Sequence, residues 1–308
     1  MELIYILTYD CNLRCKYCDI DKRIDNMSRY IIDQSFKFFE KNGISFDKIK
    51  FFWWEPLLQI NNIKYIVNEL SNNNATFYIT SNSTLVDKSF IYFIKKNNIK
   101  VTFSIDWNYK TTSLNRVLKN GSSISNNIIN NTKQYSSNIR VNQVITWETS
   151  KLFFDNFIYI YNLWVRDFNF LPAYYKEWSK DWLKNLKDGF AEILNFYKNW
   201  GNFRLVNIEN YSETSFFNIW LVIDTDWSLY LTNLILSWEF EKYKSELKVW
   251  NINTWFIFDI NNKNNISMYI KKLNNIIIKS YSKNILNSVK YVDLILNNFC
   301  YEYKNIKK

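Results

Sequence analysis

The chain has 308 residues, enough for one large domain or two ordinary ones, and 47% hydrophobic with 22% charged residues places it among globular proteins. It has no run of 18 or more apolar residues and no secretory leader, which excludes an ordinary membrane-spanning helix and predicts a cytoplasmic protein. The net charge of +10 reflects a lysine-rich composition without a compact basic run, so it is weak support for a nucleic-acid partner.

Hydrophobic periodicity in the first half of the chain predicts alternating strands and helices. Strands are expected near residues 2–7, 48–53, 75–80, 100–105, 138–146 and 166–171, and helices near 28–42, 60–73, 85–98, 113–132 and 150–163. This alternation predicts a parallel sheet with right-handed crossovers. In such folds the functional residues gather at the C-terminal ends of the strands.

The alternation fades after about residue 172. A helix is expected near 178–199, followed by two short strand-like runs, IWLVID and SLYLTN, and by helices rich in Asn and Lys from about residue 263. We therefore predict an α/β core over residues 1–200 and a smaller α+β extension over residues 201–308.

Three of the four cysteines lie within eight residues, CNLRCKYC, directly after the first predicted strand. An odd cluster of this kind, Cys11, Cys15 and Cys18, favours a metal site over a disulfide framework. Zinc needs a fourth ligand, and since the chain has no histidine only Cys300 remains, which we interpret as a buried residue of a final helix. A 4Fe-4S cluster held by three thiolates leaves one iron open for another ligand.

The C-x3-C-x2-C spacing, with Tyr17 before the last cysteine, resembles the signature of the radical SAM superfamily. The resemblance implies a partial (β/α)6 barrel with one 4Fe-4S cluster on the three cysteines, whose open iron binds S-adenosylmethionine (SAM). It also implies that an electron from a flavodoxin- or ferredoxin-type reductant cleaves SAM to methionine and a 5′-deoxyadenosyl radical, which abstracts a hydrogen from the substrate.

Two tryptophans, Trp53 and Trp54, stand before Glu55 and Pro56 where the second predicted strand ends, in the sequence FFWWEPLL. Relatives usually have Gly-Gly-Glu-Pro here, and such an exit favours residues with little or no side chain. Tryptophan also stands in the place of a family glycine in the sequence Ser-Ile-Asp-Trp, which ends at Trp107.

The same replacement recurs at Trp227, Trp250 and Trp255, in segments similar to the Asp-Gly turn and the Gly-Asn-Ile segment of peptide-modifying relatives. The whole chain has 4 glycines and 13 tryptophans. Our hypothesis is that UGA codons that mean glycine in the source organism, through an alternative genetic code, stand here as tryptophan. Trp178 and Trp182 are spaced i,i+4 on a predicted helix and are also compatible with ordinary packing.

Eight residues are implied as SAM contacts by the resemblance. Tyr17 is expected at the adenine and Trp53, Trp54 and Glu55 at the methionine amino group, with Ser104 and Arg116 at the ribose or carboxylate and Ser81 and Asn82 as further contacts. Ser and Asn are also ordinary turn residues at a strand end. Asp106 is expected to hold its own turn through an Asx motif.

The extension resembles the SPASM or twitch domain of peptide-modifying members without its cysteines. Where sulfatase-maturing relatives have a Cys-Asp pair, the best match is Thr232-Asn233, so an auxiliary cluster ligand and a carboxylate base are both missing. The expected function is a radical SAM enzyme acting on a peptide or protein. An RNA-modifying radical SAM enzyme and a non-catalytic iron-sulfur or zinc protein are the alternatives. If the indoles at 53 and 54 are real, a blocked SAM pocket and an inactive enzyme are expected.

Overall fold

The fold was analysed in a computed structural model that describes residues 1–18, 20, 22–71, 74–106, 108–209, 220–252, 259 and 262–306. Trp107 and Trp255, both named above as glycine replacements, lie outside the described residues. No helix in the described part of the chain is long and apolar enough to cross a membrane.

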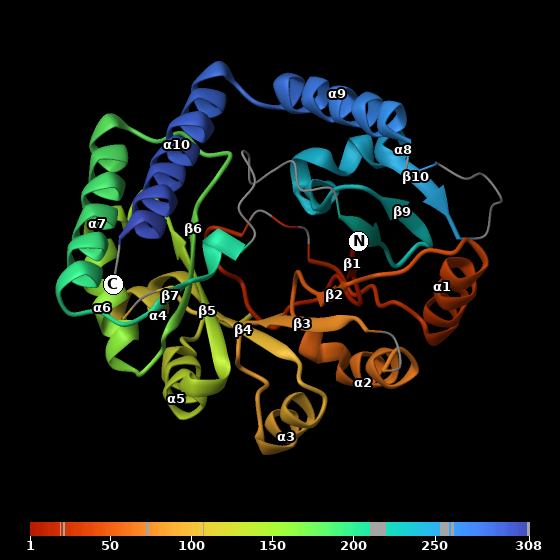
Figure 1. Ribbon diagram of the computed structural model, residues 1–308, viewed down its shortest axis with the longest axis horizontal. Coiled ribbons are helices and arrows are strands. Elements are labelled where there is room, and N and C mark those ends of the chain that lie inside the picture. Colours follow the sequence, from red (N-terminus) through yellow and green to blue (C-terminus); the bar gives the residue numbers. More distant parts are fainter. Residues whose placement is uncertain are drawn as a thin grey trace.

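Seven parallel strands form the core of the molecule and confirm the predicted alternation. In chain order they are β1 (Glu2–Tyr5), β2 (Lys48–Phe51), β3 (Thr76–Ser81), β4 (Lys100–Ser104), β5 (Ile139–Ile145), β6 (Asp167–Pro172) and β7 (Arg204–Leu205). They curve into an open arc with helices along its outer side (Figure 1). The predicted partial (β/α)6 barrel is therefore confirmed.

Helices connect these strands and cover the outer face of the arc. They are α1 (Arg29–Lys41), α2 (Ile60–Glu69), α3 (Lys88–Lys96), α4 (Tyr109–Asn115), α5 (Ser125–Tyr135), α6 (Phe153–Asn162) and α7 (Lys180–Asn199). Side-chain caps start several of them: Ser28 accepts from the N–H of Ile31, and Asp87 from that of Phe90. These caps satisfy backbone donors that a helix start leaves without an intrahelical partner.

The single helix predicted over residues 113–132 is wrong, because the chain forms α4 and α5 with an extended stretch between them. Arg116 leaves the helix with φ −112° and ψ 101°. The carbonyls of Asn115 and Val117 then accept hydrogen bonds from the backbone N–H groups of Lys16 and Arg14. The interruption therefore docks the residues after α4 onto the cysteine loop, a long-range pairing that local periodicity does not reveal.

The C-terminal part of the chain extends the same sheet. Strand β8 (Leu221–Ile223) pairs in parallel with β1, and β9 (Ser228–Tyr230) and β10 (Lys248–Asn251) follow as antiparallel strands. The order in the ten-stranded sheet of the described residues is β10-β9-β8-β1-β2-β3-β4-β5-β6-β7. Helix α8 (Lys244–Leu247) precedes β10, and α9 (Lys263–Ser280) and α10 (Lys283–Asn305) lie across the open side of the arc (Figure 1).

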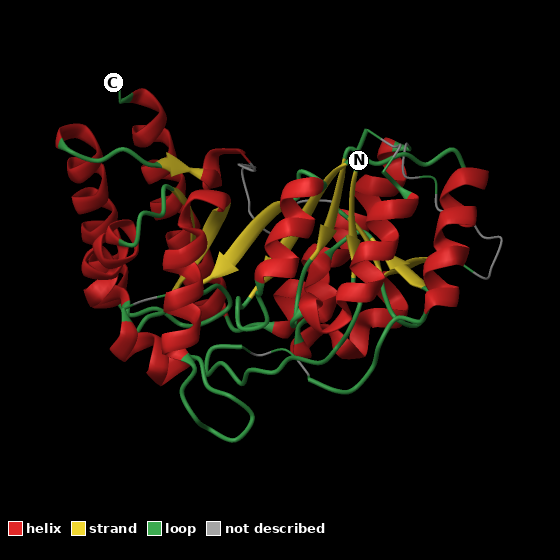
Figure 2. Cartoon of the chain, turned by 90° about the horizontal axis from the view of Figure 1, so that it is seen from below, coloured by secondary structure: helices red, strands yellow, loops and turns green. Residues whose placement is uncertain are grey.

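The two faces of the core strands differ in polarity. On β2, Ile49 and Phe51 are buried on the outer face, whereas Lys48 and Lys50 alternate with them and face the inside of the arc. A complete (β/α)8 barrel fills its interior with branched apolar side chains. Here the polar inner face leaves a lumen, and long loops gather at the sheet edge opposite the N-terminus (Figure 2).

Candidate active site

The three clustered cysteines lie on the loop that leaves β1 at its C-terminal end. Cys11 is buried and Cys15 and Cys18 are half-buried, and all three are free thiols. Burial raises the pKa of Cys11 to about 12 and also raises that of Cys15, and the neighbouring thiols raise both further. Thiols become good metal ligands once a metal displaces their protons.

Each of the three sulfur atoms accepts a hydrogen bond. The backbone N–H of Leu13 donates to Cys11 Sγ (3.4 Å), and Lys22 Nζ donates to Cys18 Sγ (3.2 Å). An Arg116 NH group donates to Cys15 Sγ (3.9 Å). Such donors stabilise thiolates and tune the potential of a bound cluster.

The donor set fits the cluster that the sequence predicts. No group of three or more His, Cys, Asp or Glu side chains in the described part of the chain is placed to hold a single metal ion. In an iron-sulfur cluster each thiolate binds a different iron, so three thiols on one loop, each with a hydrogen-bond donor, suit it chemically.

Glu55, Ser81 and Asn82 come together beside the cysteine loop. The fully buried Glu55 carboxylate accepts hydrogen bonds from Ser81 Oγ (2.9 Å), from the backbone N–H of Asn82 (2.8 Å) and from that of Leu57 (3.0 Å). The Asn82 side-chain amide donates to Cys11 Sγ (3.8 Å). Burial raises the pKa of Glu55 to about 7, although the three donors act in the opposite direction.

Asp106 is the hub of a second buried cluster, and the expected Asx turn is wrong. Its carboxylate binds Arg116 through two hydrogen bonds (2.7 and 2.9 Å) and accepts further ones from Tyr17 Oη (2.5 Å) and the backbone N–H of Val144 (3.2 Å). The N–H of Asn108, which an Asx turn would use, instead bonds to Asn156. A buried arginine attracts the carboxylate away from its own turn because an unpaired charge there would be strongly destabilising.

These two clusters unite most of the residues expected to contact SAM. Tyr17 and Arg116 meet at Asp106, while Glu55, Ser81 and Asn82 meet near Cys11. Ser104 is the half-buried last residue of β4, and no hydrogen bond within the described residues joins it to either cluster. Except for Arg116, which follows α4, they lie at the C-terminal ends of β1 to β4 or on the loops just beyond.

The backbone at Trp53 and Trp54 has the left-handed conformation that favours glycine, with φ of 76° and 50°. The indole N–H of Trp53 is buried without a hydrogen-bond partner among the described residues, and the Trp54 ring packs 4.2 Å from that of Tyr9. A bulky side chain with positive φ is a genuine outlier, so both positions have the geometry of glycine.

Two further tryptophans share this conformation. Trp227, with φ 73°, closes the hairpin between β8 and β9 where its N–H bonds to the carbonyl of Asp224. Trp164, with φ 69°, follows the end of α6, a position at which helices commonly have glycine. Trp164 is not among the tryptophans predicted above as glycine replacements, although its place just after the helix predicted over residues 150–163 was an available signal.

Other tryptophans differ from these four. Trp178 is buried, and its indole N–H donates to the carbonyl of Ala173 (2.9 Å), as a genuine tryptophan in a core does. Trp182 lies in the first turn of α7, and its ring is 6.5 Å from that of Trp147. Trp250 lies in β10, where the pairing with β9 shifts register between Lys248 and Trp250, and its buried indole N–H has no partner among the described residues.

A cavity of about 530 Å³ occupies the lumen of the arc. Inward-facing residues of β2 to β6 line it. Trp53 also lines it, at the end near the cysteine loop, since the N–H of Glu55 bonds to the carbonyl of Asp10. From the extension, Asn233 faces it, whereas Thr232 is buried and caps a short 3-10 helix (Asn233–Leu236). Cys300 is a buried residue of α10 at the cavity wall, in agreement with its interpretation as a helix core residue.

Comparison with known proteins agrees with this geometry. Residues 5–144 match the family model of the Radical SAM superfamily. An uncharacterized protein of Methanocaldococcus jannaschii is 34% identical over 131 residues, which cover 39% of this chain and 43% of that protein. The match thus spans less than half the length of this curated relative. The predicted resemblance to the radical SAM superfamily is confirmed.

Two solved structures share the fold at low sequence identity. Native anSMEcpe with bound AdoMet and the Cp18Cys peptide has a TM-score of 0.78 at 16% identity, covering 99% of each chain. SuiB of Streptococcus suis bound to the precursor peptide SuiA has a TM-score of 0.57 at 16% identity, covering 76% of this chain and 60% of SuiB. The fold of this chain is thus a partial barrel of the kind found in these two peptide-bound structures.

Proposed function

We propose that the protein is a radical SAM enzyme that acts on a peptide or protein substrate. The observation that carries the proposal is the set of three thiols, each with a hydrogen-bond donor, at the end of β1 beside a lumen of about 530 Å³. The peptide-bound fold relatives favour a peptide over RNA as the substrate.

The residues of this chain would hold and orient the cofactors. Cys11, Cys15 and Cys18 would bind a 4Fe-4S cluster, which when bound supplies the electron that cleaves SAM to a 5′-deoxyadenosyl radical. The loop from Trp53 to Glu55 lies beside the cysteine loop, since the N–H of Glu55 bonds to the carbonyl of Asp10. That position suits recognition of the SAM amino group, while Asp106 holds Tyr17 and Arg116 in fixed orientations.

We also propose that positions 53, 54, 164 and 227 are glycine in the native protein. All four have positive φ in the structure, and glycine at 53 would remove an indole from the lining of the lumen. Tandem mass spectrometry of the protein from its native source, over residues 51–58, decides the point. Peptide masses with two glycines are expected, and masses with two tryptophans would contradict the proposal.

The function is tested on anaerobically reconstituted protein reduced with dithionite, which replaces the flavodoxin- or ferredoxin-type reductant that we propose in the cell. The Trp53→Gly/Trp54→Gly chain is expected to form 5′-deoxyadenosine from SAM. Cys15→Ala should abolish this and the cluster absorbance, whereas Cys300→Ala should retain both because Cys300 lies on α10. If the glycine-containing chain binds a cluster yet leaves SAM intact, a non-catalytic iron-sulfur protein becomes the better account.

A further inference from the structure

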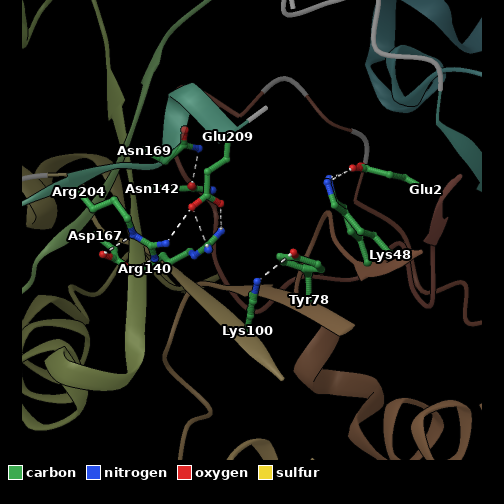
Figure 3. A network of polar contacts seen from close by, with 11 residues as sticks. Glu2, Lys48, Tyr78, Lys100, Arg140, Asn142, Asp167, Asn169, Arg204 and Glu209 are labelled. Atoms are coloured by element: carbon green, nitrogen blue, oxygen red, sulfur yellow. Dashed lines mark hydrogen bonds and ion pairs between the residues drawn. The ribbon is translucent and has the colours of Figure 1, made fainter. Parts of the chain in front are cut away.

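Three cations surround the ring of Tyr78, at the end of the lumen that lies toward the N-terminal ends of the strands. The Tyr78 ring centroid lies 5.9 Å from Lys50 Nζ, 5.4 Å from Lys100 Nζ and 6.0 Å from Arg140 Cζ. Tyr78, Lys100 and Arg140 approach one another from neighbouring strands (Figure 3). A ring face attracts cations but leaves their charge in place. Lys50 and Arg140 line the lumen and place positive charge at this end of it, whereas Lys100 is exposed and lies outside the lining.

The acidic groups near these cations are shared among several partners. Glu2 pairs with both Lys48 (2.7 Å) and Lys50 (2.6 Å). Glu209 pairs with both Arg140 (3.0 Å) and Arg204 (2.9 Å), as Figure 3 shows. Three cations, Lys48, Lys50 and Arg140, line the lumen. Glu209 is the one carboxylate among its described lining residues.

The pKa of Lys50 lies below its usual value. Burial lowers it, and the like charges of Lys48 and Arg140 lower it further, while Glu2 only partly compensates. A buried ammonium in this state gains from a second carboxylate, since opposite charges nearby favour the charged form.

The chemistry of the lumen changes along its length. Asn142 and Asn169 are joined by a hydrogen bond (2.8 Å) at mid-height, and Phe52, Val144 and Leu171 make the opposite end, beside position 53, largely apolar. The apolar end carries Trp53 and so adjoins the loop proposed to bind SAM. A ligand that fills the lumen is therefore expected to carry negative charge at one end only.

We propose that the lumen binds its peptide through a carboxylate held by Lys50 and Arg140, with the reacting residue at the apolar end near position 53. The inference rests on the proposed function and specifies its substrate class as an acidic peptide. A Glu or Asp side chain and a free chain terminus supply the same carboxylate chemistry, and the test separates these two sources.

The test measures peptide binding by calorimetry to the reconstituted Trp53→Gly/Trp54→Gly chain with SAM. The probes are an acetylated, amidated Gly-Ala-Glu-Ala-Gly peptide, its Gln counterpart, and the Gln peptide with a free C-terminal carboxylate. At least one carboxylate-bearing probe is expected to bind about tenfold more tightly than the neutral Gln peptide. The probe that does so identifies the source of the carboxylate.

The matched variants are Lys50→Met and Arg140→Met in the lumen and Lys100→Met as the control. Lys100 is exposed and lies beside the same Tyr78 ring but does not line the lumen. In the Lys50 variant Glu2 stays paired with Lys48, and in the Arg140 variant Glu209 stays paired with Arg204. Neither carboxylate is therefore left without a cation in the folded state. Each lumen variant should weaken carboxylate binding about tenfold and neutral-peptide binding less than about twofold, and the control should change neither.

Equal affinity for charged and neutral probes, or an equal loss in the Lys100 variant, would overturn the inference. Formation of 5′-deoxyadenosine without peptide is measured in parallel and tests the proposed function by itself. Carboxylate-selective binding without SAM cleavage would uphold the inference about the lumen and contradict the enzymatic function. Cleavage of SAM together with equal binding of charged and neutral probes would uphold the enzymatic function and contradict the inference about the lumen.

Discussion

Trp164 isolates the effect of backbone conformation at a single residue. Its side chain is 70% exposed, so it buries little apolar surface to offset a φ of 69°. The left-handed conformation costs a residue with a Cβ roughly 1–2 kcal/mol. We expect Trp164→Gly to raise the free energy of unfolding by up to about 1 kcal/mol in urea denaturation, after allowance for the flexibility of glycine in the unfolded chain.

Trp200 provides the matched control for this prediction. It is 84% exposed and also ends a helix, but its φ is −140°. Trp200→Gly should therefore lower the free energy of unfolding by roughly 0.5–1 kcal/mol, since glycine gains unfolded-state freedom without relief of strain. The opposite signs of the two changes test the argument, and equal destabilisation would contradict it.

The raised pKa of Glu55 predicts that the stability of the cluster-free chain depends on pH. Its pKa is raised from 4.5 to about 7 by burial, so between these values the folded state binds more protons than the unfolded state. Protonated Glu55 therefore adds about 3 kcal/mol to the free energy of unfolding. This stabilisation is fully present below pH 4.5 and is lost as the pH rises through 7. Urea denaturation of the wild type and Glu55→Gln between pH 4.5 and 7.5 measures it, and parallel pH curves would refute it.

One carboxylate, that of Asp106, holds three elements together. They are β4, the stretch after α4 and the cysteine loop. Asp106 follows β4, Arg116 follows α4 and Tyr17 lies on the cysteine loop, and all three side chains meet in a buried cluster. Asp106→Asn leaves the guanidinium without its charge partner. We expect the free energy of unfolding to fall by about 3–5 kcal/mol.

The control for this element-scale prediction is Asp188→Asn, which breaks an exposed i,i+4 pair with Lys184 on α7. That change should lower the free energy of unfolding by less than about 0.5 kcal/mol. Hydrogen exchange should accelerate at residues 13–18 and 115–118 in the Asp106 variant only. Unchanged protection there would mean that the backbone contacts hold the two segments without the carboxylate.

At the scale of the whole molecule, the extension completes the edge of the core sheet. Leu3, Ile4 and Tyr5 of β1 pair with β8, and Tyr9 Oη donates to Asp224 Oδ2 (2.7 Å) while accepting from Lys244 Nζ (2.7 Å). A chain truncated after residue 200 would expose the edge of β1 and leave Tyr9 without these partners. We expect the truncated chain to be mostly insoluble, and a soluble monomer in size-exclusion chromatography would establish residues 1–200 as an independent domain.

Apart from the helix predicted over residues 113–132, the sequence by itself determined the order and type of the core elements and the grouping of Cys11, Cys15 and Cys18, because hydrophobic period and motif spacing are local properties. Residues that end the first four strands were also predictable as site residues, since a parallel sheet gathers those ends at one edge.

Only the tertiary structure decided which partner each polar residue has. Asp106 meets Arg116 because the chain leaves α4 to pair with the cysteine loop, a contact between segments about a hundred residues apart. Lys50, Tyr78 and Arg140 come from three strands and face one lumen only because the sheet curves. Charge and hydrogen-bond partners across such distances depend on strand register and curvature, which no local pattern in the sequence specifies.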